Sequence, residues 1–246
     1  MSTLAGKAAL VTGGSRGIGA ATVRRLAQDG ADVAFTYTTS HDQAAALADQ
    51  VRAMGRTALP LKADSANPEA LTAAVEETAT ALGRFDILVN NAATVTPATI
   101  ENASLADIDR VLSVNVRAVI LAVQAALRFL PEGGRIITVG SNTADHTPFP
   151  GMALYAASKA ALSGLTRGLA REVGPRGITA VLVQPGPTDT DANPADAPHA
   201  QILRDLTPLG RYARPQDIAA TIVHLAGDGG RHITGTTVTI DGGLNS

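Results

Sequence analysis

The feature that most constrains the fold of this sequence is a glycine-rich turn that follows its first apolar segment. Ala8–Val11 is apolar at every position, and the turn Thr12–Gly19 (TGGSRGIG) comes directly after it. The stretch Ala20–Gln28 then has the residue pattern of a helix. A strand, a glycine turn and a helix in this order predict the first βα unit of a parallel sheet.

The glycine turn also indicates a ligand. Gly13, Gly17 and Gly19 permit unusual backbone angles and let the main chain approach a diphosphate, whose charge the following helix start would stabilise. The turn lacks the Gly-Lys-Ser/Thr ending of the phosphate loops of ATPases. The sequence therefore predicts a dinucleotide site and disfavours nucleotide hydrolysis. A turn that serves only strand-to-helix packing is the alternative.

Short apolar segments alternate with helical patterns along the rest of the chain. Strands are predicted at Ala8–Val11, Val33–Tyr37, Thr57–Leu61, Asp86–Asn90, Arg135–Val139, Ile178–Val183 and Thr236–Ile240. Strands that are apolar on both faces are typical of a parallel sheet covered by helices on each side. We therefore predict a doubly wound, seven-stranded parallel α/β fold of Rossmann type, with residues 1–246 in a single domain.

Local signals mark several helices. Ser40 with Gln43 predicts a capping box, and Asn67 before Pro68 predicts a helix start. Longer helices are expected over Ser104–Phe129 and Met152–Glu172.

A proline-rich stretch from Pro185 to about Leu209 breaks the alternation of strands and helices. Long loops inside compact domains are uncommon and often functional. We expect an irregular substrate lid at about 187–209.

Composition narrows the possible partners and location. The formal net charge of -2 gives no basic face for nucleic acid. The chain has no Cys, and its five His show no ligand spacing, so we assign no metal. No apolar run approaches the length of a membrane span or develops into a signal segment before Lys7, which predicts a cytoplasmic protein without a membrane contact.

The end of the second predicted strand bears on the choice of nicotinamide cofactor. Sites for NAD place an acidic residue there, to bind the ribose 2′-hydroxyl. Here the strand ends in Tyr37, Thr38, Thr39 and Ser40, which offer hydroxyls instead of a carboxylate. Arg16 in the glycine turn is available for a 2′-phosphate, so NADP(H) is favoured over NAD(H). A solvated surface arginine is the alternative reading of Arg16.

A tyrosine and a lysine are placed for proton transfer. Tyr155 and Lys159 stand at i and i+4 in a helical pattern and share one helix face. A phenol normally has a pKa of about 10, but a neighbouring ammonium and a positive nicotinamide ring would stabilise its phenolate. Taken alone the pair is weak, because amphipathic packing also produces such spacings.

Two further polar residues join the pair. Ser141 follows the predicted strand Arg135–Val139, at the sheet edge where such folds bind ligands, and its hydroxyl can polarise a carbonyl. Asn115 lies inside a predicted helix, where asparagine is unfavourable, and holding a proton-relaying water is one explanation.

Together these motifs resemble the classical short-chain dehydrogenase/reductase family over essentially the whole chain, with most similarity to the 3-oxoacyl-thioester-reductase-like branch. Ala93 departs from the glycine usual at its place. The resemblance implies that Asn115, Ser141, Tyr155 and Lys159 form a catalytic tetrad, with Tyr155 as acid/base. The expected cofactor contacts are Gly13, Ser15, Arg16, Gly17, Ile18, Gly19, Tyr37, Thr38, Thr39, Asp64, Ser65, Asn91, Ala92, Tyr155, Lys159, Pro185, Gly186, Thr188 and Thr190.

The sequence thus predicts an NADP(H)-dependent carbonyl reductase acting on a small ketone or alcohol, and the resemblance implies a homotetramer. A second function remains open, because the segment from Gln184 to Pro194 is similar to that of a cyclic-di-GMP-binding family member linked to biofilm dispersal. Arg204, Arg211 and Arg214 are the arginines available to grip such a nucleotide, although a solvated face is the preferred reading.

Overall fold

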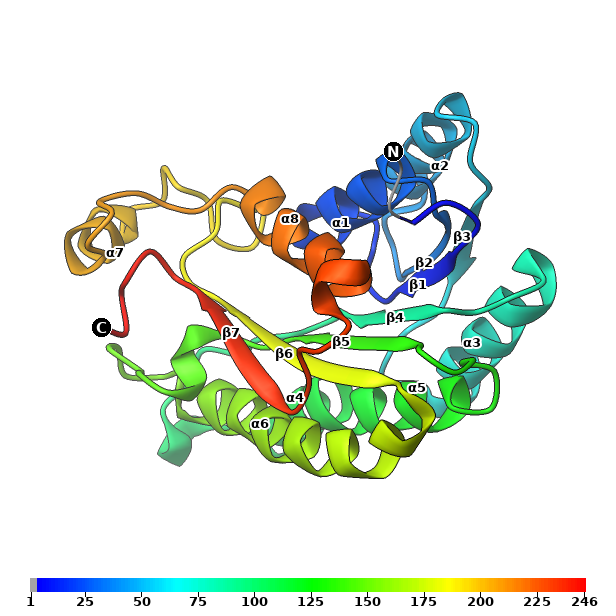
Figure 1. Cartoon of the computed structure of the whole chain (residues 1–246). Coiled ribbons are helices and arrows are strands. Elements are labelled where there is room, and N and C mark those ends of the chain that lie inside the picture. The colour runs from blue at the N-terminus through cyan, green and yellow to red at the C-terminus, as the bar shows by residue number, and fades with distance from the viewer. Residues whose placement is uncertain (1–3) are drawn as a thin grey trace.

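The computed structural model describes residues 4–246, which are arranged around one twisted sheet (Figure 1). Its strands are β1 (Ala8–Val11), β2 (Asp32–Tyr37), β3 (Ala58–Lys62), β4 (Ile87–Asn90), β5 (Arg135–Val139), β6 (Thr179–Pro185) and β7 (Thr236–Ile240). They pair in parallel in the order β3-β2-β1-β4-β5-β6-β7. The predicted doubly wound sheet is confirmed, and each strand boundary lies within two residues of its predicted place.

Helices cover both faces of the sheet (Figure 1). One layer holds α1 (Gly17–Gln28), α2 (His41–Ala53) and α8 (Pro215–Ala226), and the other holds α3 (Pro68–Leu82), α4 (Leu105–Leu112), α5 (Ala118–Ala126) and α6 (Ala153–Val173). Successive strand residues face opposite layers, so Val11 joins the core beneath α1 and Leu10 joins the core beneath α5. Both side chains are fully buried, which explains the continuous apolar strands of the sequence.

The helix starts follow the sequence signals in part. Asn67 caps α3 by accepting a hydrogen bond from the N–H of Ala70, as predicted. Helix α2 does begin after Ser40, but the predicted capping box is wrong, because the Ser40 side chain makes no capping hydrogen bond. Its backbone angles (φ -84°, ψ 61°) lie outside the extended conformation of a usual N-cap.

Two longer segments also differ from expectation. The predicted helix over Ser104–Phe129 is divided by a π-helical turn at Ser113–Arg117, which separates α4 from α5, and α5 ends at Ala126. The lid is not irregular throughout, because it contains α7 (Ala200–Leu206) between Pro198 and Pro208. These two prolines bound the helix, and no proline interrupts it.

The topology fixes where a ligand site is to be found. The chain winds from β1 outward to β3 and then returns to β4 on the other side of β1. Loops that leave the carboxyl ends of β1 and β4 therefore diverge and open a crevice between them. Within residues 4–246, no helix is long and apolar enough to cross a membrane.

Candidate active site

A cavity of about 990 Å³ lies at the carboxyl edge of the sheet, where the loops after β1 to β6 converge. Every residue that the sequence predicted as a cofactor contact lines it. Of the four predicted catalytic residues, Ser141, Tyr155 and Lys159 line the cavity and Asn115 does not. The volume is at the upper end of the range for ligand pockets, which suits a dinucleotide together with a small substrate.

The glycine turn is held by close backbone packing. Gly13 has a φ of 63°, which favours glycine, and its N–H donates to Thr36 Oγ1 at 2.9 Å. A Cβ on Gly19 would lie 2.3 Å from the carbonyl oxygen of Gly13. Gly19 therefore serves the folding of the turn itself, and the backbone path beside the cavity depends on it.

Residues directly after β4 clamp the same turn, and the sequence reasoning missed part of this role. The Asn91 side chain donates to the carbonyl oxygens of Thr12 (3.0 Å) and Gly13 (2.9 Å). The Thr12 hydroxyl accepts from the N–H groups of Asn91 and Ala92. Only the pairing of β1 with β4 brings these residues together, so no local pattern could have revealed the clamp.

The start of α1 has the features of an anion-binding element. The helix spans Gly17–Gln28, its N-cap Arg16 forms no side-chain cap, and its first turn holds no acidic residue. The first N–H groups of a helix have no intrahelical partners and carry a partial positive charge. Because Arg16, Gly17 and Ile18 line the cavity, this end of α1 fits a diphosphate.

The end of β2 offers hydroxyls and a nearby cation. Thr38 and Thr39 are exposed and line the cavity, and no carboxylate stands at this strand end. The exposed Arg16 side chain has neither a hydrogen bond nor an ion pair with any residue between 4 and 246. These groups suit a phosphate on the ribose better than a bare hydroxyl.

Asp64 after β3 is already engaged. Its carboxylate accepts from the N–H of Ala66 (2.9 Å) and pairs with Arg110 (3.0 Å). Burial acts to raise the pKa of Asp64, but the Ala66 N–H and Arg110 outweigh it and leave the pKa below its usual value. The carboxylate is thus ionised and fixed at the wall of the cavity.

Tyr155 and Ser141 lie beside each other in the cavity wall. Burial raises the pKa of the Tyr155 phenol, and a hydrogen bond with Ser141 acts in the opposite direction without cancelling the effect. Lys159 was expected to lower this pKa, and its Nζ lies 5.8 Å from the centroid of the Tyr155 ring, but burial dominates and the net shift of the pKa is upward. The phenol is therefore protonated at neutral pH.

Lys159 is a buried cation with one main-chain partner. Its Nζ donates to the carbonyl oxygen of Val139 at 2.9 Å, and the residue is 2% exposed. Desolvation lowers the pKa of Lys159 to about 8. At neutral pH the ammonium persists, one helical turn from Tyr155.

Asn115 has a different position from the one expected. It lies in the π-helical turn, 1% exposed, and its side chain binds both main-chain groups of Thr94 (2.8 and 2.9 Å) and the Ser158 hydroxyl (3.0 Å). Asn115 is not among the residues that line the cavity. Its hydrogen bonds to Thr94 and Ser158 connect the loop after β4 to α6. Turns of π type occur often at functional sites.

The lid begins directly over the glycine turn. A Cβ on Gly17 would lie 3.3 Å from Thr190 Cγ2, so Thr190 packs against the start of α1. Asp189 accepts from the N–H of Ala195, and His199 pairs with Asn193 at 3.0 Å. Among residues 4–246, no three His, Cys, Asp or Glu side chains gather as a metal site.

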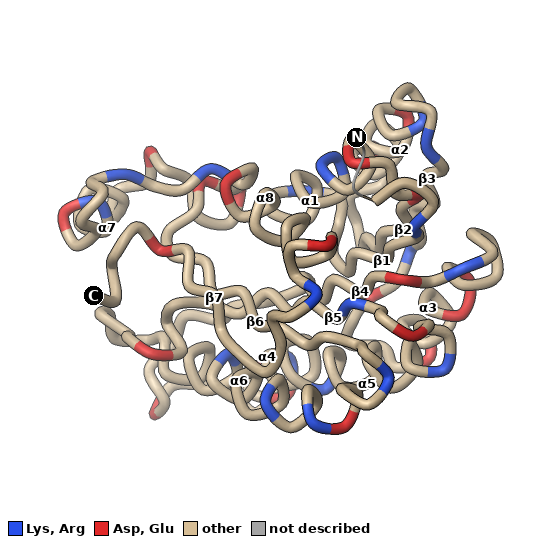
Figure 2. Tube along the Cα trace, viewed as in Figure 1, with Lys and Arg blue, Asp and Glu red and all other residues tan. Residues whose placement is uncertain are grey.

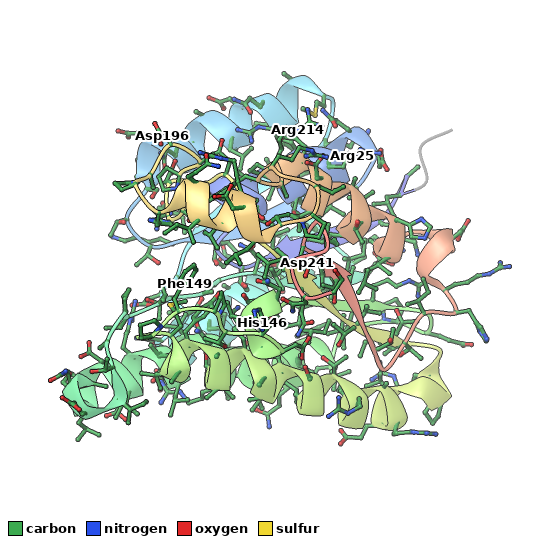
Figure 3. All side chains as sticks on the ribbon, turned by 90° about the vertical axis from the view of Figure 1, so that its left-hand side faces the viewer. Arg25, His146, Phe149, Asp196, Arg214 and Asp241 are labelled. Atoms are coloured by element: carbon green, nitrogen blue, oxygen red, sulfur yellow. The ribbon has the colours of Figure 1, made fainter. Side chains whose placement is uncertain are left out.

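The three arginines considered for a cyclic dinucleotide have partners within the protein. Arg204 donates to the carbonyl oxygen of Ala195 (2.7 Å), and Arg211 and Arg214 both pair with Asp217 (3.8 and 3.2 Å). None of the three lines the cavity. Figure 3 shows Arg214 above the lid, beside α8.

Comparisons with known proteins find relatives over nearly the whole chain. A family model described as enoyl-(acyl carrier protein) reductase matches residues 13–245. A cyclic-di-GMP-binding biofilm dispersal mediator protein of Escherichia coli is 45% identical over 246 residues, which is 100% of both chains.

Two solved structures extend the comparison. A short-chain dehydrogenase from Burkholderia cenocepacia, in complex with NADP, is 54% identical with a TM-score of 0.98, and the match covers 99% of this chain and 100% of that one. A blue fluorescent protein from a metagenomic library, in complex with NADPH, is 49% identical with a TM-score of 0.98 and the same coverage.

Proposed function

Since this chain belongs to the short-chain dehydrogenase/reductase family, we propose that it is an NADP(H)-dependent oxidoreductase that interconverts a ketone and its alcohol. The observation that carries the proposal is a single cavity lined by both the uncapped start of α1 and the Tyr155 phenol. A diphosphate-binding element and a proton donor then face the same space, as hydride transfer from a dinucleotide requires.

The cofactor is NADP(H), as in the two solved relatives that hold it. The start of α1 binds its diphosphate, and Arg16 with Thr38 and Thr39 binds the 2′-phosphate. When bound, NADPH supplies the hydride. The remaining contacts are those expected from the sequence: Gly13, Ser15, Tyr37, Asp64, Ser65, Asn91, Ala92, Pro185, Gly186, Thr188 and Thr190.

Tyr155 completes the reduction by donating its phenolic proton to the carbonyl oxygen, while the carbonyl carbon receives the hydride. Ser141 hydrogen-bonds the same oxygen and orients it. Lys159 stabilises the phenolate that remains. Because burial raises the pKa of Tyr155, the free protein is prepared for reduction rather than for proton abstraction. Asn115 is a positioning residue that fixes Thr94 and α6.

The whole chain acts as one domain, and residues 187–209 act as the substrate lid. The lid packs on the glycine turn through Thr190, which supports closure over a bound cofactor. The proposed location is the cytoplasm, which fractionation of cells tests.

The proposed assembly is a homotetramer. Helices α4 and α5 carry Leu105 (73% exposed), Leu112 (42%) and Ile120 (46%), which a second copy would cover. Light scattering after size exclusion should give about four times the mass of one chain, and a monomer would contradict the proposal.

A second function is binding of cyclic-di-GMP, favoured by the 45% identity with the biofilm dispersal mediator of Escherichia coli. The internal pairing of Arg204, Arg211 and Arg214 argues against it, because binding a nucleotide would have to break those contacts. Retention of the Tyr155, Ser141 and Lys159 arrangement beside the cofactor turn favours the reductase.

An NADPH-oxidation screen against ketones, sugars, quinones and acyl thioesters tests the proposal. Calorimetric titration with cyclic-di-GMP is run beside it, with and without saturating NADPH. We expect turnover of at least one ketone and no nucleotide binding. Binding of cyclic-di-GMP without any turnover would replace the reductase by the second function.

A further inference from the structure

The cavity has two ends that differ in charge. The sheet order places the segments after β2 and β3 on one side of the glycine turn and the loops after β5 and β6 on the other. The lining residues among 4–246 include three cations. Arg16 lies in the turn, Arg110 pairs with Asp64 after β3, and Lys159 is buried against Val139. Both accessible cations therefore belong to the cofactor end.

The other end, here named the substrate end, has mainly uncharged side chains, many of them apolar. It is lined by Val95, Pro97, Phe149, Met152, Leu203 and Leu244, which come from the loops after β4 and β5, from the lid and from the C-terminal segment. Figure 3 shows Phe149 on the lower side of this region, beneath the lid. Polar groups at its base include the hydroxyls of Ser141, Thr143 and Tyr155 and the amide of Asn142.

Among the described lining residues, the carboxylate at the substrate end would oppose an anion. The lid contributes Asp191, a carboxylate, and His199, whose ring is bonded to Asn193. No Lys or Arg of the described lining comes from the lid, the loop after β5 or the C-terminal segment. A carboxylate or phosphate would lose water there without gaining a cation, and Asp191 would repel it.

We propose that the substrate of this site is an uncharged, apolar ketone, and that carbonyl compounds bearing a carboxylate or phosphate are poor substrates. The inference rests on the proposed function and deepens it. An uncharged ketone buries its apolar part against Phe149, Met152 and Leu203, while Ser141 and Tyr155 satisfy its oxygen. Hydride and proton both go to the carbonyl group, as in the reaction above, so no further reactant is needed.

A matched pair of ketones tests the inference. Methyl 4-acetylbenzoate and 4-acetylbenzoate differ in one charge, and both are assayed by NADPH oxidation at neutral pH. We expect kcat/KM for the ester to exceed that for the acid by about tenfold or more, because like charges and lost solvation penalise the acid. Equal values, or a preference for the acid, would overturn the inference.

The two ketones also differ in intrinsic reactivity. Comparing the acid-to-ester ratio of kcat/KM between two lid variants cancels that difference. Ile202 lines the cavity and is 52% exposed, so a charge placed there need not be buried. We expect Ile202→Lys to raise the acid-to-ester ratio of kcat/KM by about tenfold relative to Ile202→Gln. The same ratio in both variants would count against the inference. Failure of every carbonyl compound in the broad screen would remove the proposed function itself, which is a separate outcome.

Discussion

Two titratable groups, the half-buried Tyr155 and the buried Lys159, dominate the chemistry at the scale of single residues. Burial raises the pKa of Tyr155 and lowers that of Lys159 to about 8, because a poorly solvated site penalises the charged form of each. The two shifts leave a protonated phenol beside an ammonium near neutral pH. That combination suits an acid that donates a proton and is then stabilised as phenolate.

The pH dependence of reduction follows from Lys159. Its ammonium is present below about pH 8 and is lost above it, so the rate of ketone reduction should fall as pH rises through about 8. Stopped-flow measurement of hydride transfer at saturating NADPH checks the profile. In Lys159→Met we expect a rate lower by about 100-fold, without the decline near pH 8. A wild-type profile that stays flat to high pH would exclude this role.

Arg16 should discriminate between the two nicotinamide cofactors. Replacing it by Ala removes charge-assisted hydrogen bonds to the 2′-phosphate, each about 1.5–3 kcal/mol. We expect Arg16→Ala to raise the Kd of NADPH by about tenfold or more and the Kd of NADH by much less. Fluorescence titration measures both, with Arg24→Ala as the control, because Arg24 lies in the helix that follows Arg16 but bonds Gln50 outside the cavity. Equal losses for the two cofactors would show that Arg16 does not bind the 2′-phosphate.

The sequence predicted which residues line the cavity, but it did not predict the partners of their neighbours such as Asn115. The glycine turn and the spacing of Tyr155 and Lys159 are local patterns, and both appear in the structure as expected. Asn115 bonds Thr94 and Ser158, which lie 21 and 43 residues away, so its side-chain partners depend on the tertiary fold. The raised pKa of Tyr155 also required the fold, because burial causes it.

The C-terminal segment after β7 is the element that braces the reacting loop. Asp241, labelled in Figure 3, accepts from the N–H groups of Gly243 (3.0 Å) and Asn245 (2.9 Å). The Asn245 side chain then exchanges two hydrogen bonds with Asn142 (3.1 and 2.8 Å). Asn142 follows Ser141 directly, so the segment supports the residue that holds the substrate oxygen.

Loss of these contacts should lower kcat/KM for the ketone more than it changes the affinity for NADPH. In Asn245→Ala, two side-chain hydrogen bonds of about 1 kcal/mol each are removed. We expect kcat/KM for the ketone to fall by about fivefold or more, while the Kd of NADPH stays within about twofold. Ser246→Ala is the control, because its hydroxyl bonds only Gly243 of its own segment. A change in NADPH affinity as large as that in kcat/KM would contradict the separate role of the segment.

At the scale of elements, the sequence signals located the strands and one of the two predicted helix caps. Asn67 and Pro68 begin α3 as predicted, whereas Ser40 does not cap α2. The π-helical turn at Ser113–Arg117 has no sequence signature of its own, because its residues continue the helical pattern on both sides. The short lid helix Ala200–Leu206 was missed because the prolines around it indicate an irregular loop and conceal a helix of two turns.

At the scale of the whole molecule, a buried charge cluster around Asp86 lies at the opposite edge of the sheet from the cavity. Lys and Arg are interspersed with Asp and Glu over both layers (Figure 2). At the amino ends of the strands, Asp86 is 3% exposed and pairs with Lys7 (3.2 Å) and Arg84 (2.6 Å), and it accepts from the N–H of Ala8. Burial acts to raise the pKa of Asp86, but these partners outweigh it and hold the pKa below its usual value.

This cluster should make the free energy of unfolding depend on pH in the acidic range. Because the folded pKa of Asp86 is depressed, its contribution is present above the unfolded value of about 4 and is lost as pH falls through the folded pKa. At pH 7 we expect Asp86→Asn to lower the free energy of unfolding by about 2 kcal/mol. Urea unfolding measures the difference, which should shrink below pH 4. The exposed pair of Asp49 with Arg52 is the control, and Asp49→Asn should change little.

The central claim is that Tyr155 donates the proton in a cavity that also binds NADPH, and Tyr155→Phe tests it most directly. The change removes one hydroxyl and little contact area, so the Kd of NADPH should stay within about threefold while kcat falls by about 1000-fold or more. Both are measured on one preparation with the best ketone of the screen. Turnover near that of the wild type, with NADPH bound normally, would contradict the account.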